Sequence, residues 1–384
     1  MIGSVQTIAK GGCGIIHDAE KTVFVPGVIS GETIEFDIQK KNKGIWQGKL
    51  LRVLEPSPQR LSAPCRHYLD CGGCNLQHMS YAEQLRCKED ILAANLIKIA
   101  AFKPRGPIPV LPSPPFRYRS KTELQVINSA IGFFKSKSHR LVAVRQCLLL
   151  NDAAEDFMRG LPPLPAADDG VLQVLSNGTD VAGRMQTRSG KIRKLTPCAS
   201  LPFDFPPYHY QYGPEHFIQA NLFQLQPMLE LLIAQLPTNC DGAAADFFCG
   251  VGFFTLPLAR HFKQVFALEK DPDNLAALRA NLESNHITHV KIRCEDALEA
   301  DIPPLDLVVL DPPRGGLSPA LINRLAQVKK IIYFSCDSAT FARDLRLFFS
   351  KNYNLRELQI IDNFPQTDHF EIFSVLEKAT GAGS

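Results

Sequence analysis

The chain has 384 residues, which is enough for two or three domains. Hydrophobic residues make up 45% and charged residues 21% of it, as in ordinary globular proteins, and the formal net charge is only +3. This charge permits a nucleic-acid partner but requires any basic surface to be local. No apolar run approaches the roughly 20 residues that cross a membrane, and the amino terminus lacks a signal pattern. We therefore expect a cytoplasmic, monomeric protein with no membrane span.

Residues 1–54 consist of short apolar runs separated by turns, a pattern that predicts evenly spaced strands and a small β-barrel. Basic residues recur along this stretch, which also contains Trp46. Such a barrel often binds nucleic acid, although a solvated basic face is the simpler interpretation. Pro56, Pro58 and Pro64 then predict a linker.

Three of the eleven cysteines, Cys65, Cys71 and Cys74, fall within ten residues, and two glycines let this loop fold back. In a reducing compartment, such a group indicates a metal site. Zinc and an iron–sulfur cluster with one remote cysteine both suit the spacing, so the residues alone leave the metal open. Cys147 is the better fourth ligand, because Cys87 lies in a helical pattern and is expected in the core.

The pattern from residue 116 to about 201 is mostly strand-like, with basic and aromatic side chains interleaved. Single-stranded RNA needs both kinds, for its phosphates and its stacked bases, whereas a solvated sheet face is the alternative. The residues concerned are Arg117, Tyr118, Arg119, Lys121, Phe133, Phe134, Lys135, Lys137, His139 and Arg140. We expect a β-rich central domain over residues 65–210 that contains the cysteine site and binds RNA.

From Phe217 onward strands and helices alternate, which predicts a parallel sheet in an α/β domain over residues 211–384. The first helix is expected over residues 219–236 and the first strand over residues 243–248. The turn after that strand, from Phe248 to Gly252, contains glycines that let the backbone approach a ligand closely.

Acidic residues follow the next two predicted strands. Glu269 lies about 20 residues after Gly250, where a carboxylate can hold ribose hydroxyls, and Asp296 is placed to reach an adenine edge. Thr255 stands where a dinucleotide fingerprint needs its last glycine, which disfavours a dehydrogenase. The pattern favours an adenosine ligand without a pyrophosphate, such as S-adenosylmethionine.

The segment Asp311-Pro-Pro-Arg314 ends the fourth strand, and its two prolines stiffen a turn that aims Asp311 and Arg314 into the site. Methyltransferases that act on exocyclic amines carry an aromatic residue after the prolines, to stack the base. Arg314 therefore argues against an amine target.

Cys336 is expected at the carboxyl end of a strand, since it follows the apolar run 331–332 and precedes a helical segment, 338–350. Ligands gather at this edge of α/β sheets. A helix amino terminus lowers the pKa of a thiol, and Asp337 opposes this effect. An inert buried cysteine is the simpler interpretation of one cysteine alone. Glu371 begins the last predicted strand and shares the edge if that strand lies beside the strand of Cys336.

A thiol, a carboxylate and an adenosine pocket suit one reaction, the methylation of uracil at C5. The C5 carbon is not nucleophilic by itself, but attack of a thiolate at C6 turns it into an enolate carbon that accepts a methyl group. A base then removes the C5 proton and the thiol leaves.

The chain resembles the RNA uracil-C5 methyltransferases, the 5-methyluridine family, over nearly its whole length. The segments that carry the resemblance are Phe217-Ile-Gln219-Ala-Asn221, Phe248-Cys-Gly-Val-Gly252, Asp311-Pro-Pro-Arg314, Ser335-Cys336 and Phe364-Pro-Gln-Thr367-Asp-His369-Phe-Glu371. The resemblance implies an α/β fold: a class I S-adenosylmethionine-dependent methyltransferase (Rossmann-like) domain with an N-terminal small β-barrel of the TRAM type and a β-rich central domain.

The resemblance also implies roles for individual residues, with Cys336 as the nucleophile and Glu371 as the base. The residues expected to contact the cofactor are Gln219, Phe248, Gly250, Glu269, Asp296 and Asp311. Four cysteines match the [4Fe-4S] ligands of the ribosomal-RNA members, which favours iron–sulfur over zinc. They are Cys65, Cys71, Cys74 and Cys147.

The chain departs from the family pattern at three places. Phe253 and Asp296 stand where members often have asparagine, and Ser335-Cys336-Asp337-Ser338 replaces the usual Ser-Cys-Asn-Pro. Asp337 is expected to weaken the activation of the thiol without removing the nucleophile.

We therefore expect an S-adenosylmethionine-dependent enzyme that methylates C5 of a uridine in RNA, with 23S ribosomal RNA as the expected target. The alternative within the class is uridine 54 of transfer RNA, because some cluster-bearing members act there. An alternative of another class is an RNA-binding iron–sulfur or zinc protein whose methyltransferase domain is inert. The presence of both Cys336 and Glu371 argues against it.

Overall fold

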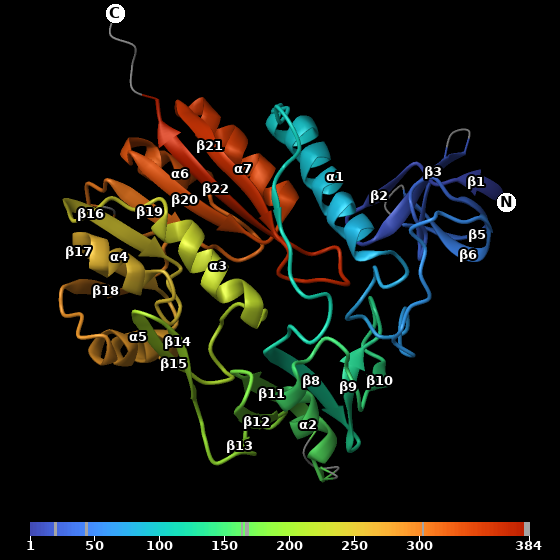
Figure 1. The fold of residues 1–384 in the computed structure, drawn as a ribbon, viewed down its shortest axis with the longest axis horizontal. Helices are drawn as coiled ribbons and strands as arrows, with labels where there is room; N and C mark the ends of the chain where they lie inside the picture. The colour runs from blue at the N-terminus through green and yellow to red at the C-terminus, as the bar shows by residue number, and fades with distance from the viewer. Residues whose placement is uncertain (19–20, 43–44, 163, 166–168, 302, 380–384) are drawn as a thin grey trace, which may run out of the picture.

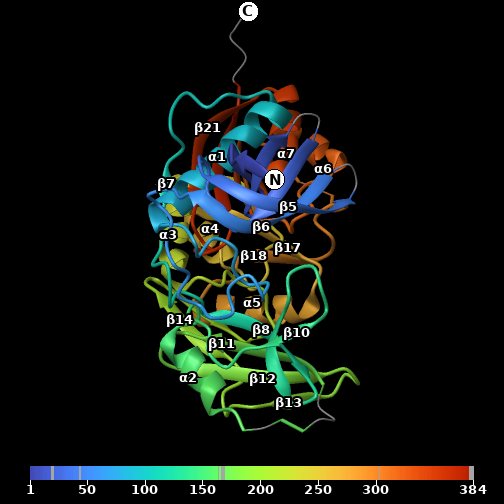
Figure 2. The same cartoon turned by 90° about the vertical axis from the view of Figure 1, so that its right-hand side faces the viewer.

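The computed structural model describes residues 1–18, 21–42, 45–162, 164–165, 169–301 and 303–379. Three large sheets and a two-stranded hairpin make up the fold, and a long helix, α1 (Tyr81–Ala100), lies between the N-terminal sheet and the C-terminal sheet (Figure 1). Turning the molecule by 90° shows the middle sheet at the end opposite the other two (Figure 2). In the described part of the chain, no helix is long and apolar enough to cross a membrane.

The N-terminal sheet has the strand order β1-β5-β6-β4-β3-β2. Its strands are β1 (Ile2–Ser4), β2 (Thr7–Ala9), β3 (Cys13–Asp18), β4 (Lys21–Pro26), β5 (Thr33–Asn42) and β6 (Ile45–Glu55). Its apolar side chains form a separate core that Leu76, Met79 and Cys87 complete from outside the sheet. The prediction that Cys87 is a core residue is thus confirmed, and it lies within α1, which was expected over residues 81–99.

The central sheet is antiparallel throughout, with the order β10-β9-β8-β11-β12-β13. The strands are β8 (Lys121–Ile127), β9 (Ala130–Phe134), β10 (Leu141–Ala143), β11 (Gly170–Ser176), β12 (Val181–Thr187) and β13 (Ile192–Lys194). Helix α2 (Asp152–Gly160) packs on β11 and β12. A hairpin of β14 (Leu201–Phe205) and β15 (Tyr208–Tyr212) follows and joins the core of the third sheet.

The third sheet has eight strands in the order β18-β17-β16-β19-β20-β22-β21-β7. The strands are β7 (Val110–Leu111), β16 (Cys240–Phe247), β17 (Phe262–Glu269), β18 (Val290–Cys294), β19 (Leu307–Leu310), β20 (Lys330–Ser335), β21 (Tyr353–Ile361) and β22 (Glu371–Lys378). The first five strands in this order, from β18 through β17, β16 and β19 to β20, are mutually parallel. Strand β22 is antiparallel to both β20 and β21. Strand β7 pairs with β21, although it comes from the range expected for the central domain.

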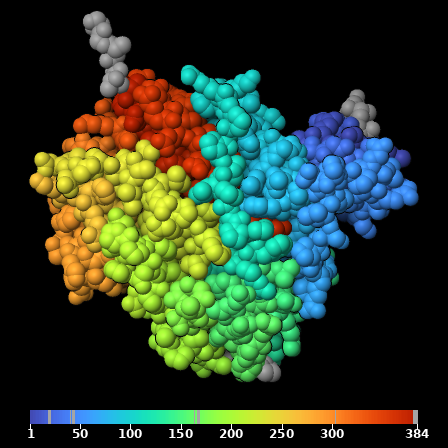
Figure 3. Space-filling view, in the orientation of Figure 1, coloured from blue at the N-terminus to red at the C-terminus, as the bar shows by residue number. Residues whose placement is uncertain are grey.

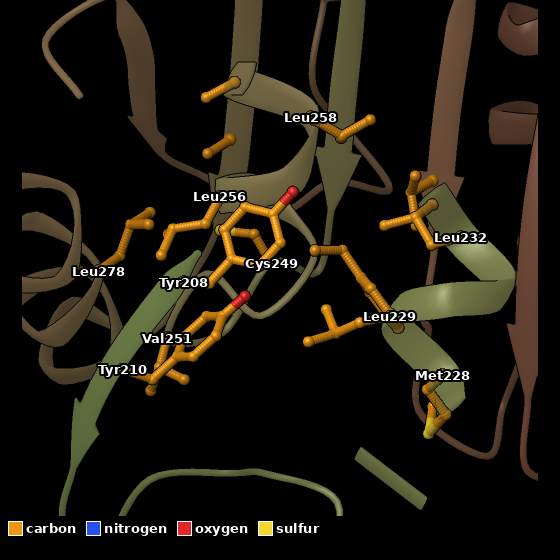
Figure 4. Close-up of a cluster of buried hydrophobic side chains, with 14 of the residues drawn as sticks. Tyr208, Tyr210, Met228, Leu229, Leu232, Cys249, Val251, Leu256, Leu258 and Leu278 are labelled. Atoms are coloured by element: carbon orange, nitrogen blue, oxygen red, sulfur yellow. The ribbon is translucent and has the colours of Figure 1, made fainter. Parts of the chain in front are cut away.

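Helices cover both faces of this sheet, as the alternation of strands and helices predicts. They are α3 (Leu222–Ile233), α4 (Thr255–His261), α5 (Pro272–Ser284), α6 (Pro319–Arg324) and α7 (Ser338–Ser350). Successive residues of β16 point to opposite faces, so Ala244 belongs to one buried cluster and Ala245 to the other. Figure 4 shows part of the first cluster, where Leu229 and Leu232 of α3 lie near Leu258 of α4.

Helix α3 begins later than the sequence predicts. Residues 219–236 were expected to be helical, but Asn221 is the N-cap, and its side chain accepts a hydrogen bond from the Phe223 amide at 3.1 Å. An asparagine at this position satisfies an amide that the helix itself leaves free. Gln219 therefore lies in the loop before the helix, and the direction of its side chain is not set by the helix.

A buried ion pair connects α1 to the loop that follows β21. The Lys88 ammonium of α1 contacts the Asp362 carboxylate and donates to the Phe364 carbonyl at 3.1 Å. Both charged side chains are fully buried, and the Tyr81 hydroxyl donates to the second Asp362 oxygen at 2.9 Å. Because the loop leads directly into Glu371, this pair fixes one side of the site.

Replacing Asp362 by asparagine should destabilise the protein strongly, because the buried Lys88 ammonium loses its counter-charge. Breaking a buried pair from one side typically costs about 3 to 5 kcal/mol of the free energy of unfolding. The matched control is Lys263→Met, which breaks the exposed pair of Lys263 with Asp241 and should change little. Urea unfolding measures both, and equal stabilities of the two variants would contradict the prediction.

Candidate active site

A cavity of about 1310 Å³ lies where the carboxyl ends of the third sheet's strands face the central sheet. All of the residues that the sequence singles out for catalysis, cofactor binding and metal binding line it. The space-filling view shows how the N-terminal, central and C-terminal parts of the chain close around the middle of the molecule (Figure 3). Residues from two distant parts of the sequence, 65–149 and 217–371, therefore line one cavity.

The turn after β16 brings backbone, rather than side chains, to the cavity. Phe248, Gly250 and Gly252 all have a positive φ, and the Gly250 amide donates to a Glu269 oxygen at 3.1 Å. A Cβ on Gly252 would lie 2.4 Å from a Leu278 methyl, so only glycine fits there. The second Glu269 oxygen accepts from the amides of residues 270 and 271, each at 2.9 Å, which orients the carboxylate at the end of β17.

Gln219 and Asp311 meet at the centre of this edge. The Gln219 amide nitrogen lies 3.4 Å from an Asp311 oxygen, and its carbonyl oxygen accepts from the Asn363 amide at 2.6 Å. Burial raises the pKa of Asp311 to about 7, while the Gln219 bond opposes the rise. The loop before α3 and the loop after β21 thus hold the end of β19 between them.

Asp246 is a buried acid whose role the sequence analysis did not assign. Burial raises its pKa to about 8, the Thr255 hydroxyl donates to one oxygen at 2.6 Å, and Asp311 and Glu269 raise the pKa further. Its other oxygen has no partner among the described residues. Its place in the motif just before Phe248 was the available signal, but only the structure shows that it is fully enclosed.

Cys336 and Glu371 come from neighbouring strands, as expected. The register pairs Ser335 of β20 with Ile372 of β22, which places Cys336 level with Glu371 at the cavity edge. Helix α7 begins two residues after Cys336 and spans the predicted residues, 338–350. Asp337 is its N-cap, because one of its oxygens accepts from the amides of residues 339 and 340 at 3.1 and 3.0 Å.

The electrostatic environment of the thiol differs from the one expected. Burial raises the pKa of Cys336 to about 12, and the carboxylates of Glu371 and Asp311 add to this rise. Arg314 acts in the opposite direction, and Asp337 raises the pKa as the sequence predicts. The net direction that the sequence leaves open is thus upward, because desolvation and neighbouring negative charge raise the pKa of the thiol.

Glu371 is fully enclosed. Burial raises its pKa well above the usual value, Asp311 raises it further, and Arg314 lowers it. One of its oxygens has no hydrogen-bond partner in the part of the chain that is described. The buried carboxyl groups of Glu371 and Asp311 thus influence each other, and together with the thiol they can hold, accept and release protons at one place.

The four cysteines approach one another although Cys147 is remote in sequence. Cys65, Cys71, Cys74 and Cys147 all line the cavity. Burial raises the pKa of Cys74 to about 12, and its three neighbours raise it further by their charge. Among the residues that the structure describes, however, no group of histidine, cysteine and acidic side chains is close enough to hold a single metal ion.

Basic and aromatic side chains of the central domain form the facing wall of the cavity. Its members are Arg119, Lys121, Phe133, Phe134, Lys135, Lys137 and His139. Phe253, the departure from the family pattern, packs instead with Phe205, Tyr210 and Phe254 in an aromatic cluster. The substitution therefore lies in the hydrophobic packing behind the turn.

Sequence reasoning missed the contacts that the N-terminal sheet makes with this edge. Lys10 forms an ion pair with Asp337, and the Gly11 amide donates to an Asp368 oxygen at 2.6 Å. Residues 10 and 337 lie far apart in the sequence, so no local pattern could have connected them.

The fold and the site define an α/β methyltransferase. The tRNA (uracil-54, C5)-methyltransferase of Pyrococcus abyssi, solved with S-adenosyl-L-homocysteine, superposes with a TM-score of 0.74 at 21% identity, over 98% of this chain and 99% of its own. The tRNA (Uracil-5-)-methyltransferase family matches residues 183–302 and 303–379, just over half of the chain. The chain belongs to this family and is an S-adenosylmethionine-dependent RNA (uracil-C5-)-methyltransferase.

Curated relatives match at full length. The 23S rRNA (uracil(1939)-C(5))-methyltransferase RlmD of Pseudomonas putida is 29% identical, with 97% of this chain and 92% of the relative covered. RlmD of Legionella pneumophila is 28% identical over 97% of this chain and 96% of its own length. An uncharacterized RNA methyltransferase of Aquifex aeolicus is 28% identical, with 97% of each chain covered.

Replacing Asp311 by asparagine should make stability less sensitive to pH. The folded protein binds the Asp311 proton more tightly than the unfolded chain does, so its stabilising contribution is present at low pH and lost as pH rises towards about 7. The melting temperature of Asp311→Asn minus that of the natural protein should therefore be higher at pH 8 than at pH 5, by at least about 2 °C.

The matched control is Asp306→Asn. The Lys329 ammonium beside Asp306 lowers the pKa of that carboxyl, so its contribution is complete above the usual pKa and constant between pH 5 and pH 8. Thermal unfolding of the three proteins at both pH values is the measurement. Parallel melting temperatures for Asp311→Asn and the natural protein would contradict a raised pKa at Asp311.

Proposed function

We propose that this enzyme methylates C5 of a uridine in 23S ribosomal RNA through a covalent adduct between Cys336 and C6. The observation that carries the proposal is the position of Cys336 and Glu371 on adjacent strand ends of one cavity. The same edge presents Gln219, Asp311 and the glycine turn. Full-length likeness to the RlmD enzymes supports ribosomal RNA as the substrate.

Cys336 acts first in the proposed reaction. Its thiolate forms a bond to C6, and the electron pair of the C5=C6 bond moves to make an enolate that is nucleophilic at C5. The cofactor supplies the methyl group that C5 then takes up, and S-adenosylhomocysteine is the product. The raised pKa of Cys336 means that the free protein holds a thiol, so Arg314 is the group that favours its ionisation.

Glu371 acts second, as the base. It accepts the C5 proton, the C5=C6 double bond re-forms, and the bond from sulfur to C6 breaks to return the thiolate. Burial and Asp311 raise its pKa, which makes its carboxylate a stronger base than an exposed one. Arg314 lies close enough to stabilise the carboxylate before it accepts the proton.

The proposed cofactor residues are Gln219, Phe248, Gly250, Glu269, Asp296 and Asp311. Their positions support this assignment, because Glu269, Asp296 and Asp311 follow three neighbouring strands and all line the cavity. The oriented Glu269 carboxylate suits ribose hydroxyls, and the backbone turn at Gly250 leaves room for a ligand.

We propose that RNA lies between the basic and aromatic wall of the central domain, residues 65–210, and the catalytic domain, residues 211–384. Lys135 and Lys137 suit phosphates, and Phe133 and Phe134 suit bases. The N-terminal sheet, residues 1–54, is proposed to be a TRAM barrel that extends this surface in a cytoplasmic monomer. Uridine 54 of transfer RNA is the second candidate, favoured by the fold of the Pyrococcus abyssi enzyme.

The four cysteines are proposed to hold a [4Fe-4S] cluster. Their thiols line one cavity and influence one another by charge, which fits a common ligand. The described residues form no group close enough for a single metal ion, so the proposal rests on the shared cavity and on the match of the four cysteines to the family's cluster ligands. Methyl transfer requires no electron, so the cluster would tie the cysteine loop to the central sheet.

Two variants should separate the catalytic steps. Cys336→Ala should abolish methylation and any protein–RNA adduct, because the bond to C6 cannot form. Glu371→Gln should form the methylated adduct and release it about 100- to 10,000-fold more slowly. Incubation with 23S ribosomal RNA or transfer RNA, followed by a denaturing gel, measures trapped RNA, and mass spectrometry locates the 5-methyluridine.

Trapping of 23S ribosomal RNA alone would support the proposed substrate, and trapping of transfer RNA alone would support the second candidate. Normal turnover by Glu371→Gln with no trapped RNA would require another base. An inert methyltransferase domain would give no 5-methyluridine with the natural protein on either RNA.

Replacing one proposed cluster ligand should lower the iron content of the protein before it lowers the methylation activity. Cys71→Ser should lose iron and the absorbance near ~400 nm after anaerobic purification, while the exposed Cys198→Ser retains both. Iron and zinc analysis of the three proteins is the measurement. Bound zinc without iron in the natural protein would exclude the iron–sulfur assignment.

A further inference from the structure

The turn between β2 and β3 reaches from the N-terminal sheet to the active-site edge. The Gly11 amide donates to an Asp368 oxygen at 2.6 Å, and the Asn75 amide donates to the other oxygen at 2.6 Å. The Asp368 amide in turn donates to the Asn75 side chain at 3.0 Å. A Cβ on Gly12 would lie 2.8 Å from that side chain, so the turn fits closely.

This joint places Lys10 beside Asp337, the residue that follows the candidate nucleophile. The Lys10 ammonium pairs with Asp337, the residue that follows Cys336, while the other Asp337 oxygen caps α7. The Asp337 side chain is 15% exposed and that of Lys10 is 47% exposed. The pair therefore lies at the surface of the site, with its acidic member turned inward.

Asp337 introduces a negative charge at a position where the resemblance leads one to expect asparagine. Asparagine would cap α7 equally well. The aspartate instead adds to the negative groups near Cys336, which are Glu371 of β22 and Asp311 at the end of β19. Arg314 is the cation that acts on Cys336 from the β19 loop.

We propose that Lys10 is a positioning residue for the reaction: its ammonium neutralises the Asp337 carboxylate and thereby keeps the neighbouring Cys336 thiol reactive. The inference rests on the proposed role of Cys336 as the nucleophile. The N-terminal sheet thus contributes to the chemistry and not only to the surface that RNA contacts. Without Lys10, the Asp337 carboxylate would act on Cys336 uncompensated, together with Glu371 and Asp311 and against Arg314.

The alternative is that Lys10 only fastens the turn to the loop. A fastening role would change stability and leave the pH dependence of the thiol alone. The hydrogen bonds of Gly11 and Asn75 to Asp368 involve neither Lys10 nor residue 337, so they hold the turn in place in every variant. His369 faces the same region and is influenced by Lys10, so each measurement is a pH series that separates its titration from that of Cys336.

The experiment measures alkylation of Cys336 by iodoacetamide in the full-length protein under anaerobic conditions, by peptide mass spectrometry from pH 7 to pH 10. The exposed Cys198 and Cys294 serve as internal standards in every sample. Lys10→Met should slow Cys336 alkylation about three- to tenfold and move its pH profile upward. Asp337→Asn should alkylate at least as fast as the natural protein.

The double variant tests whether Lys10 acts through the Asp337 charge, and the alkylation profile of Lys10→Met separates this from fastening. If Lys10 acts through the Asp337 charge, Lys10→Met should have no further effect in the Asp337→Asn background. Lys98→Met, which removes an equal charge from an exposed position of α1, should match the natural protein. An unchanged profile in Lys10→Met, or an equal slowing in both backgrounds, would overturn the inference.

Failure of the proposed function would look different. If Cys336→Ala still methylated RNA, the nucleophile assignment would be wrong, whatever the alkylation rates are. If Cys336→Ala is inactive and Lys10→Met leaves the thiol unchanged, only the role of Lys10 falls.

Discussion

The burial of acidic groups at one sheet edge is the constraint on which the active site depends. Asp311 and Glu371 are enclosed near the Cys336 thiol, Asp246 is enclosed near Asp311, and burial raises the pKa of each of these groups. Ionising any of them costs desolvation energy, and the charges of Asp311 and Glu371 raise the pKa of the neighbouring thiol further. A nearby cation, Arg314, therefore has a large effect on which group is charged.

This edge holds its shape because the loop after β21 is fixed from several sides. Lys88 of α1 pairs with Asp362 in the interior, and the amides of residues 75 and 76 donate to the Gln366 carbonyl at 3.1 and 3.0 Å. Asp368 is bound by the β2–β3 turn. The N-terminal sheet, α1 and the cysteine loop thus position the segment that ends in Glu371. Three parts of the chain therefore hold the residue that is proposed as the base.

The local patterns predicted several elements closely. Helix α7 spans the expected residues because its apolar face and its capping Asp337 are both local signals. The start of α3 was misplaced by three residues, since only the bond of the Asn221 side chain to the Phe223 amide shows where the helix begins. The raised pKa of Cys336 was also missed, because desolvation depends on neighbours from other strands.

The sequence by itself determined the class of the enzyme and a set of residues that line one cavity, because motifs at strand ends are local and strand ends of a parallel sheet meet at one edge. The tertiary structure alone decided how Cys147 reaches the cysteine loop, which β-strand faces Cys336, and that Lys10 meets Asp337. These contacts join residues tens to hundreds of positions apart, and their energies come from burial and charge. Neither quantity can be read from the spacing of residues along the chain.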